Sequence, residues 1–196
     1  MSNLLEIYHY DISKMSDEEF FKMYLSSDES RKAKADRIKH NPSKKLSIAA
    51  GELARKIIAQ KFNIDKEDVR FRVDKSGKPY IEGIDVNFSI SHSGTIALCA
   101  IADAPVGVDI EKIRDVDLSI AKKHFALDEQ DYVFEKLSLS KQRFFEIWTI
   151  KEAYFKMLVN GIANFSEFST MGNKNIETHI RNKYIVSVCT MKKATK

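Results

Sequence analysis

The stretch VNFSISHSGTIALCAIADAPVGVDIE, from Val86 to Glu111, predicts three consecutive β-strands. Residues 86–91 alternate between apolar and polar side chains, residues 95–102 are nearly all apolar, and residues 106–110 form a third strand-like run. The links between these runs are short and contain glycine or proline, which favour turns. We therefore expect the three strands to be neighbours in an antiparallel sheet.

Helices are expected on both sides of this strand-rich stretch. Ser16 resembles an N-cap, with Glu19 three residues later as its capping-box partner. Asn41-Pro42 should separate two helices, and Asn160-Gly161 should end a long one. The expected helices are residues 31–40, 43–62, 119–125, 127–137 and 140–160, and further strands are expected at residues 4–10, 69–73 and 184–191.

This order of elements predicts an α+β fold in two halves. The break between them is expected near residues 114–118, which gives an N-terminal lobe of residues 1–113 and a C-terminal lobe of residues 114–196. The 196 residues, 43% of them hydrophobic, are enough to form a core in each half.

The composition is that of an ordinary globular protein. No run of 18 apolar residues occurs, and the first residues lack the basic start and apolar run of a signal peptide, so a cytoplasmic location is expected. Cys99 and Cys189 each lie in an apolar run, which favours two buried reduced thiols over a disulfide.

Positive charge is concentrated between Ser30 and Lys61. This segment has ten basic and two acidic residues, although the net charge of the whole chain is only +4. Such a patch suits a polyanion such as a nucleotide, a nucleic acid or an acidic protein. A solvated helical face would also account for it.

Two acidic motifs could bind a metal ion. In Gly107-Val108-Asp109-Ile110-Glu111 the two carboxylates should lie on one face of a strand, where a divalent cation would offset their burial. An edge strand with one wet face would also explain this pattern. In the helix from Trp148 to Lys156, Glu152 and Lys156 share a face, which suits either a surface ion pair or a metal ligand beside a phosphate-binding lysine.

Two turns could bind an anion. Residues 89–93, Ser-Ile-Ser-His-Ser, offer hydroxyl groups, an imidazole and backbone N–H groups. Because Ser91 and His92 are adjacent on a strand they should face apart, which argues against a nucleophile–base pair. Gly77-Lys78-Pro79 displays Lys78 at a turn, although such turns are often simple connectors.

The four motifs together, in this order, resemble those of the Sfp-type 4′-phosphopantetheinyl transferases, and the resemblance covers most of residues 30–162. It implies transfer of the 4′-phosphopantetheine group of coenzyme A (CoA) to a serine of an acyl or peptidyl carrier protein, with release of 3′,5′-ADP. By similarity, Asp109, Glu111 and Glu152 bind Mg²⁺ together with the pyrophosphate. Glu152 also helps to deprotonate the serine, directly or through water, and Lys156 neutralises the phosphate under attack. The positions that match the family's CoA contacts are Arg31, Lys34, Ser47, Lys78, Ser91, His92 and Lys156.

The resemblance also implies an architecture. The family fold has two similar α/β lobes related by a pseudo-two-fold axis, with the active site at the lobe interface. Asp109 and Glu111 would then end the first half, and Glu152 would come from the second. A chain of this length should form the site as a monomer, with CoA and a carrier protein as its partners and no binding to nucleic acid or membrane.

Two other functions fit parts of the pattern. A metal-dependent pyrophosphate or nucleotide hydrolase would use the same carboxylates with water as the nucleophile. A non-enzymatic anion-binding module would use the basic segment alone, but that segment has few aromatic residues for base stacking. The sequence leaves open which carrier protein is used and whether Mg²⁺ or Mn²⁺ is preferred.

Overall fold

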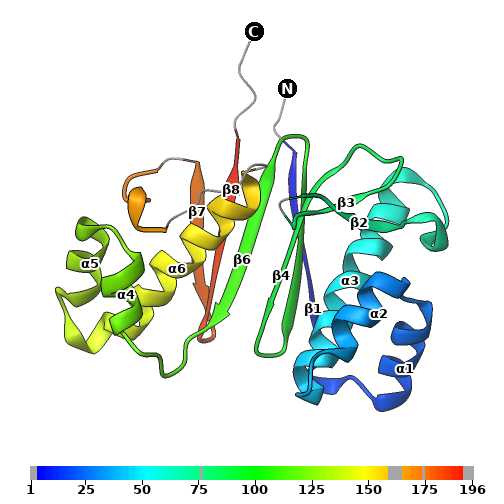
Figure 1. Ribbon diagram of the computed structural model, residues 1–196, viewed down its shortest axis with the longest axis horizontal. Helices are drawn as coiled ribbons and strands as arrows, with labels where there is room; N and C mark the ends of the chain where they lie inside the picture. Colours follow the sequence, from blue (N-terminus) through cyan, green and yellow to red (C-terminus); the bar gives the residue numbers. More distant parts are fainter. Residues whose placement is uncertain (1–3, 76, 159–164, 174, 192–196) are drawn as a thin grey trace, which may run out of the picture. The chain divides into compact units, whose positions relative to one another are not determined.

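The chain folds into two units, Met1–Asp103 (unit 1) and Ala104–Lys196 (unit 2). The computed structural model in Figure 1 describes residues 4–75, 77–158, 165–173 and 175–191. The division falls before the strand at residues 106–112, whereas the expected lobe boundary fell after residue 113. Within the described residues, no helix is both long and apolar enough to cross a bilayer.

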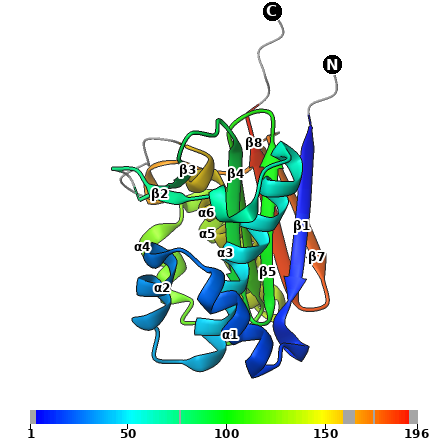
Figure 2. The ribbon, with the colours of Figure 1, turned by 90° about the vertical axis from the view of Figure 1, so that its right-hand side faces the viewer.

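Unit 1 is a three-stranded antiparallel sheet covered by a long helix. The sheet has the order β1-β5-β4, and β2 and β3 form a separate two-stranded sheet. Helix α3 packs on the three-stranded sheet, as Figure 2 shows, and its apolar residues form a core with Phe88 and Ile101. The elements of unit 1 are β1 Leu5–Asp11, α1 Asp17–Ser26, α2 Glu29–Asp36, α3 Asn41–Phe62, β2 Phe71–Val73, β3 Pro79–Ile81, β4 Asn87–Ser93 and β5 Ile96–Ala102.

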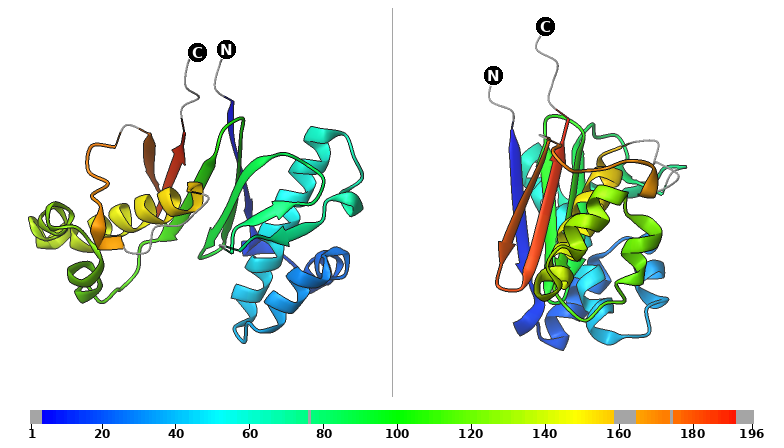
Figure 3. Two further views of the ribbon diagram at one scale, coloured as in Figure 1. Left: turned by 45° about the horizontal axis from the view of Figure 1, so that its top comes forward. Right: turned by 90° about the vertical axis from the view of Figure 1, so that its left-hand side faces the viewer.

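Unit 2 is built in the same way around its own sheet, which has the order β6-β8-β7. Helix α6 packs on β6 and β8 (Figure 3), and its aromatic residues Phe144 and Phe145 form a core with Phe125 and Ile185. The elements of unit 2 are β6 Val106–Lys112, α4 Ser119–His124, α5 Leu127–Phe134, α6 Ser140–Met157, β7 Ile176–Arg181 and β8 Tyr184–Thr190.

The two units share one topology. In each, the first strand pairs antiparallel with the last strand, the last strand is central, and the strand before it closes the other edge. In each, the long helix follows the first strand and packs on the sheet. The protein is therefore an α+β fold in two halves, as the order of elements predicted, and the two halves share one strand order.

The prediction that residues 86–91, 95–102 and 106–110 form neighbouring strands of one sheet is wrong for the third strand. Strands β4 and β5 pair as predicted, but β6 does not continue their sheet. It pairs instead with β8, from Val106 opposite Thr190 to Lys112 opposite Tyr184. A short link between two strands therefore does not make them neighbours here, because β6 is the first strand of the next unit.

Several helix ends also differ from the prediction. Ser16 does cap α1, accepting a bond from the Glu19 N–H at 3.1 Å, but the Glu19 carboxylate accepts from the Tyr10 hydroxyl. Helix α2 ends at Asp36, and α3 begins at Asn41, since proline is tolerated in a first helical turn. Helix α6 ends at Met157, and the expected Asn160-Gly161 cap lies outside the described residues.

Candidate active site

Strand β6 turns its odd-numbered residues toward α6. A Cβ atom at Gly107 would lie 1.8 Å from the Ala153 carbonyl oxygen and 2.6 Å from the Met157 nitrogen, so only glycine permits this approach. Across the sheet Gly107 pairs with Cys189, whose sulfur lies 3.4 Å from the Met157 sulfur. Because side chains alternate along a strand, Asp109 and Glu111 also face α6.

Lys156 of α6 reaches the first of these carboxylates. Its Nζ lies 2.6 Å from Asp109 Oδ1 and donates to the Val108 carbonyl oxygen at 3.3 Å. The Asp109 side chain is only 7% exposed, whereas that of Lys156 is 31% exposed. The ion pair therefore places one positive charge beside Asp109, the more buried of the two carboxylates on β6.

Glu152 lies one helical turn before Lys156 and completes this group. Burial raises the pKa of Glu152, and repulsion from Asp109 and, to a smaller extent, from Glu111 raises it further, while Lys156 acts in the opposite direction. Glu152 accepts no hydrogen bond from any residue in the described part of the chain. Its carboxylate is thus half-buried among like charges.

The family resemblance led us to expect Asp109 and Glu111 in the first half of the chain and Glu152 in the second. The structure instead places all three, with Lys156, in unit 2. The reason is again the pairing of β6 with β8, beneath α6. One strand and one helix of the same unit are enough to assemble the acidic residues.

The chemistry of this group fits a hard divalent cation. Three carboxylates supply oxygen ligands, and a cation would relieve the repulsion that raises the pKa of Glu152. However, no three acidic, histidine or cysteine residues within the described ranges are arranged closely enough to hold a metal as they stand. Asp109 is paired with Lys156, and Glu111 with Arg114 at 2.7 Å. Binding a metal would therefore require these side chains to rotate.

Lys151, adjacent to Glu152, has a different environment. It is fully buried, pairs with the equally buried Glu129 at 2.9 Å, and donates to the carbonyl oxygens of Phe165 and Phe168. Glu129 in turn accepts bonds from the N–H and hydroxyl groups of Thr170. This buried pair joins α5, α6 and residues 165–170. Sequence reasoning missed Glu129, which carries no motif.

Arg31, the first basic residue of the segment between Ser30 and Lys61, is buried in unit 1. Its guanidinium carbon lies 5.2 Å from the centroid of the Phe71 ring, and its side chain packs against Gly51 of α3. Burial lowers the pKa of Arg31, while the negative charges of Asp28 and Glu52 act to raise it. The side chain is therefore held in one position by packing, with its charge only partly compensated.

Ser47 lies one turn before Gly51 on α3, on the side of the helix that meets Arg31. Its hydroxyl oxygen is buried and has no hydrogen-bond partner among the residues that the structure describes. A buried hydroxyl group without a partner is costly, so a polar ligand at this position would stabilise it. The structure thus brings two of the expected CoA contacts, Arg31 and Ser47, to one place.

The other expected anion contacts of unit 1 belong to different elements. Lys34 is exposed and lies three residues after Arg31 in the last turn of α2. Lys78 is in the β2–β3 turn, where its N–H donates to Asp74 Oδ1 at 2.9 Å and where burial lowers the pKa of its amino group. Gly77 has a φ of 88°, which suits glycine in this turn.

Ser91 and His92 lie on opposite faces of their sheet. His92 pairs with Ala97, which belongs to the core beneath α3, so His92 is on the α3 face. Ser91 pairs with Leu98 and points to the other face. This arrangement agrees with the expectation that the two side chains face apart, and it leaves His92 on the same face as the helix that carries Ser47.

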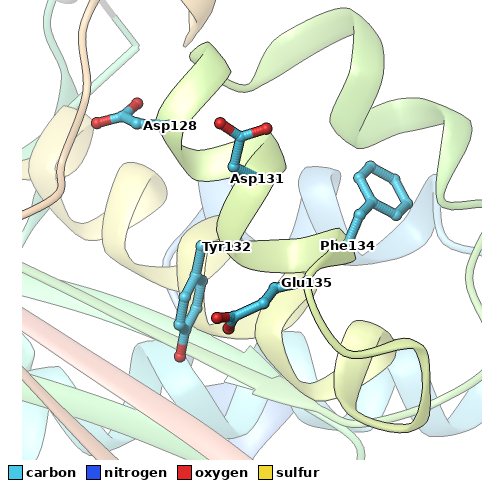
Figure 4. A pocket seen from close by; sticks show the side chains of 5 residues that line it. All are labelled: Asp128, Asp131, Tyr132, Phe134 and Glu135. Atoms are coloured by element: carbon cyan, nitrogen blue, oxygen red, sulfur yellow. The ribbon is translucent and has the colours of Figure 1, made fainter.

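A hollow on α5 holds none of these residues. Figure 4 shows its lining, and the hydroxyl group of Tyr132 there donates to Glu146. Three of its five lining side chains are carboxylates, so it is unsuited to an anionic ligand. The lining residues are Asp128, Asp131, Tyr132, Phe134 and Glu135.

Comparison with known proteins assigns both units to one family. A model described as "4′-phosphopantetheinyl transferase superfamily" matches residues 105–195, and one described as "4′-phosphopantetheinyl transferase, N-terminal" matches residues 14–104. The chain therefore belongs to the Sfp-type 4′-phosphopantetheinyl transferase superfamily. The boundary between the two matches falls within a residue or two of the boundary between the units.

Three curated proteins illustrate the relationship. The chain is 40% identical over 117 residues to the 4′-phosphopantetheinyl transferase gsp of Aneurinibacillus migulanus, over 59% of this chain and 49% of the relative. It is 31% identical over 147 residues to Sfp of Bacillus subtilis (strain 168), over 74% and 65% of the two chains. It is 34% identical over 135 residues to psf-1 of Bacillus pumilus, over 68% and 58%. The matched region thus spans about half to two thirds of the length of these relatives.

Proposed function

We propose that this protein transfers the 4′-phosphopantetheine group of CoA to a serine of an acyl or peptidyl carrier protein and releases 3′,5′-ADP. The observation that carries the proposal is the grouping of Asp109, Glu111, Glu152 and Lys156 on β6 and α6. The family to which the chain belongs supplies the reaction class, since the relatives are named as 4′-phosphopantetheinyl transferases.

In this proposal Asp109, Glu111 and Glu152 would hold Mg²⁺, which would supply positive charge against the pyrophosphate of CoA. Glu152 takes the proton of the carrier serine, directly or through water. The serine oxygen bonds to the phosphorus that bears pantetheine, and the bond from that phosphorus to the bridging oxygen breaks. Lys156 neutralises negative charge on the phosphate, and 3′,5′-ADP leaves.

The basic residues of unit 1 would bind the remaining charge of CoA. Arg31, Lys34 and Lys78 offer positive charge, and Ser47, Ser91 and His92 offer polar contacts. The buried Arg31 guanidinium supports this role, as does the Ser47 hydroxyl, which has no hydrogen-bond partner among the described residues, because anionic ligands pair with groups of both kinds.

The test is intact-mass analysis of several apo carrier proteins incubated with the purified protein, CoA and Mg²⁺. We expect the mass of one phosphopantetheine group to be added to at least one carrier protein from fatty-acid, polyketide or nonribosomal-peptide synthesis. If no carrier protein gains this mass, the proposal is wrong. Breakdown of CoA in the absence of any carrier protein would instead indicate a hydrolase.

Glu152→Gln and Asp109→Asn should each reduce transfer by at least about tenfold, since each removes a charged metal ligand. Both variants should still fold. Because the pKa of Glu152 is raised in the folded state, its ionised form opposes folding at neutral pH, so Glu152→Gln should match or exceed the wild-type melting temperature there. The check is to measure the transfer rate and the melting temperature of each variant. A variant that is folded and keeps full activity would contradict the assignment of its residue as a metal ligand.

Gly51→Ala should weaken CoA binding without unfolding the protein. A Cβ atom there would lie 2.7 Å from Arg31 Nε, so the arginine side chain must move, while alanine favours the helix by about 1 kcal/mol. We expect the KM for CoA to rise several-fold at nearly constant kcat. If Arg31→Ala has the same effect, the double variant should be no worse than either single one. Additive losses would show that Gly51 does not act through Arg31.

A further inference from the structure

The ion pair between Lys156 and Asp109 compensates a buried negative charge at the proposed metal site. Lys156 Nζ lies 2.6 Å from Asp109 Oδ1, and the Asp109 side chain is only 7% exposed. An ionised aspartate at this depth is costly unless a positive charge lies beside it. In the absence of a metal, the ammonium group of Lys156 supplies that charge.

Lys156 also acts on a second carboxylate of the group. Its charge opposes the repulsion that Asp109 and Glu111 exert on Glu152, which lies four residues earlier on the same helix. The third carboxylate, Glu111, is paired with Arg114 at 2.7 Å instead. The positive charge of Lys156 therefore acts on both Asp109 and Glu152, two of the carboxylates that the proposed cation would bind.

We propose that Lys156 is an internal substitute for the divalent cation, and that metal binding at Asp109 displaces its ammonium group. This inference rests on the metal role proposed above for the three carboxylates. Once displaced, the lysine side chain, which is 31% exposed, can turn toward a bound phosphate without leaving Asp109 uncompensated. Metal binding would thus release Lys156 for its role at the phosphate. The positive charges of the metal ion and of Lys156 would then become available to the substrate together, and only once the metal is bound.

The direct test follows the lysine ammonium groups by NMR in protein labelled with ¹⁵N-lysine, during titration with Mg²⁺ alone. Lys156→Met assigns the Lys156 signal. Lys151 is an internal reference on the same helix, because Glu129 and two carbonyl oxygens hold its ammonium group. We expect the Lys156 signal to shift or to broaden through exchange with water as Mg²⁺ saturates, while that of Lys151 stays unchanged. An unchanged Lys156 signal at saturating Mg²⁺, or no binding of Mg²⁺ at all, would overturn the proposal.

A second measurement compares affinities for Mn²⁺ by electron paramagnetic resonance, without CoA or carrier protein. Lys156→Met should bind Mn²⁺ roughly fivefold more tightly than the wild type, the size expected for losing a partly exposed charge pair. Lys141→Met is the matched control, because Lys141 lies on the same helix but pairs with the exposed Asp115. An affinity of Lys156→Met equal to or weaker than that of the wild type would contradict the inference.

Both measurements are independent of the transfer reaction. A protein that fails to modify any carrier protein, yet releases Lys156 when Mg²⁺ binds, would retain this inference and lose the proposed function. A protein that transfers phosphopantetheine without any change at Lys156 would do the reverse.

Discussion

Replacing Gly107 with alanine is expected to lower the free energy of unfolding by about 3 kcal/mol and to reduce the proposed phosphopantetheine transfer by about a hundredfold. The added Cβ atom would lie 1.8 Å from the Ala153 carbonyl oxygen and 2.6 Å from the Met157 nitrogen. Both obstacles are backbone atoms of α6, so the helix as a whole must move away from β6. The same movement would take Glu152 away from Asp109.

Two measurements check this prediction: urea unfolding of the variant and its rate of carrier modification at a temperature where it is folded. The control is Gly172→Ala in the same unit, where a Cβ atom would meet nothing within 4 Å but φ is 74°. It should cost about 1 kcal/mol from backbone conformation alone and leave transfer unchanged. Equal losses for the two variants would show that the approach of α6 to β6 is not what Gly107 provides.

Lys151→Met is expected to destabilise the protein by about 4 kcal/mol, because it leaves the carboxylate of Glu129 buried without its counter-charge. Neither side chain is exposed, and their separation is 2.9 Å. The carbonyl oxygens of Phe165 and Phe168 also lose the donor that joins residues 165–170 to α6. Burial already lowers the pKa of Lys151, so the pair is held together against a considerable desolvation cost.

The double variant Glu129→Gln/Lys151→Met separates lost charge pairing from lost packing. It removes both charges, so it should unfold at a higher urea concentration than Lys151→Met alone. If the double variant is as unstable as the sum of the two single variants, the ion pair is not the source of the stability. Lys141→Met, at an exposed pair on the same helix, should change the free energy of unfolding by less than about 1 kcal/mol.

Most strands and helices could be predicted from the sequence because their signals are local. The apolar run that becomes β5 and the spacing that becomes α3 are each visible within one segment. The partner of β6 could not be predicted, because Val106 pairs with Thr190 across most of unit 2. No local feature of either strand specifies that pairing, and the short link to β5 suggested another.

For the acidic part of the candidate site, too, only local features could be predicted from the sequence. Alternation placed Asp109 and Glu111 on one face, and helical spacing placed Glu152 beside Lys156. The sequence did not show that Lys156 pairs with Asp109, or that Lys151 is buried, since both facts depend on contacts between elements. Adjacent residues of one motif, Lys151 and Glu152, thus have different environments because successive helical residues point in different directions.

The repeated sheet order, in which the first strand of each unit pairs with the last, also bears on synthesis of the chain. Unit 1 has all its strands once Ala102 has been made, but the central strand of unit 2 is completed only at Thr190. Until then β6 has no partner, and its carboxylates have no finished sheet to support them. The folding of unit 2 therefore depends on a long-range strand pairing, and it can be completed only after nearly the whole of that unit has been made, later than the folding of unit 1.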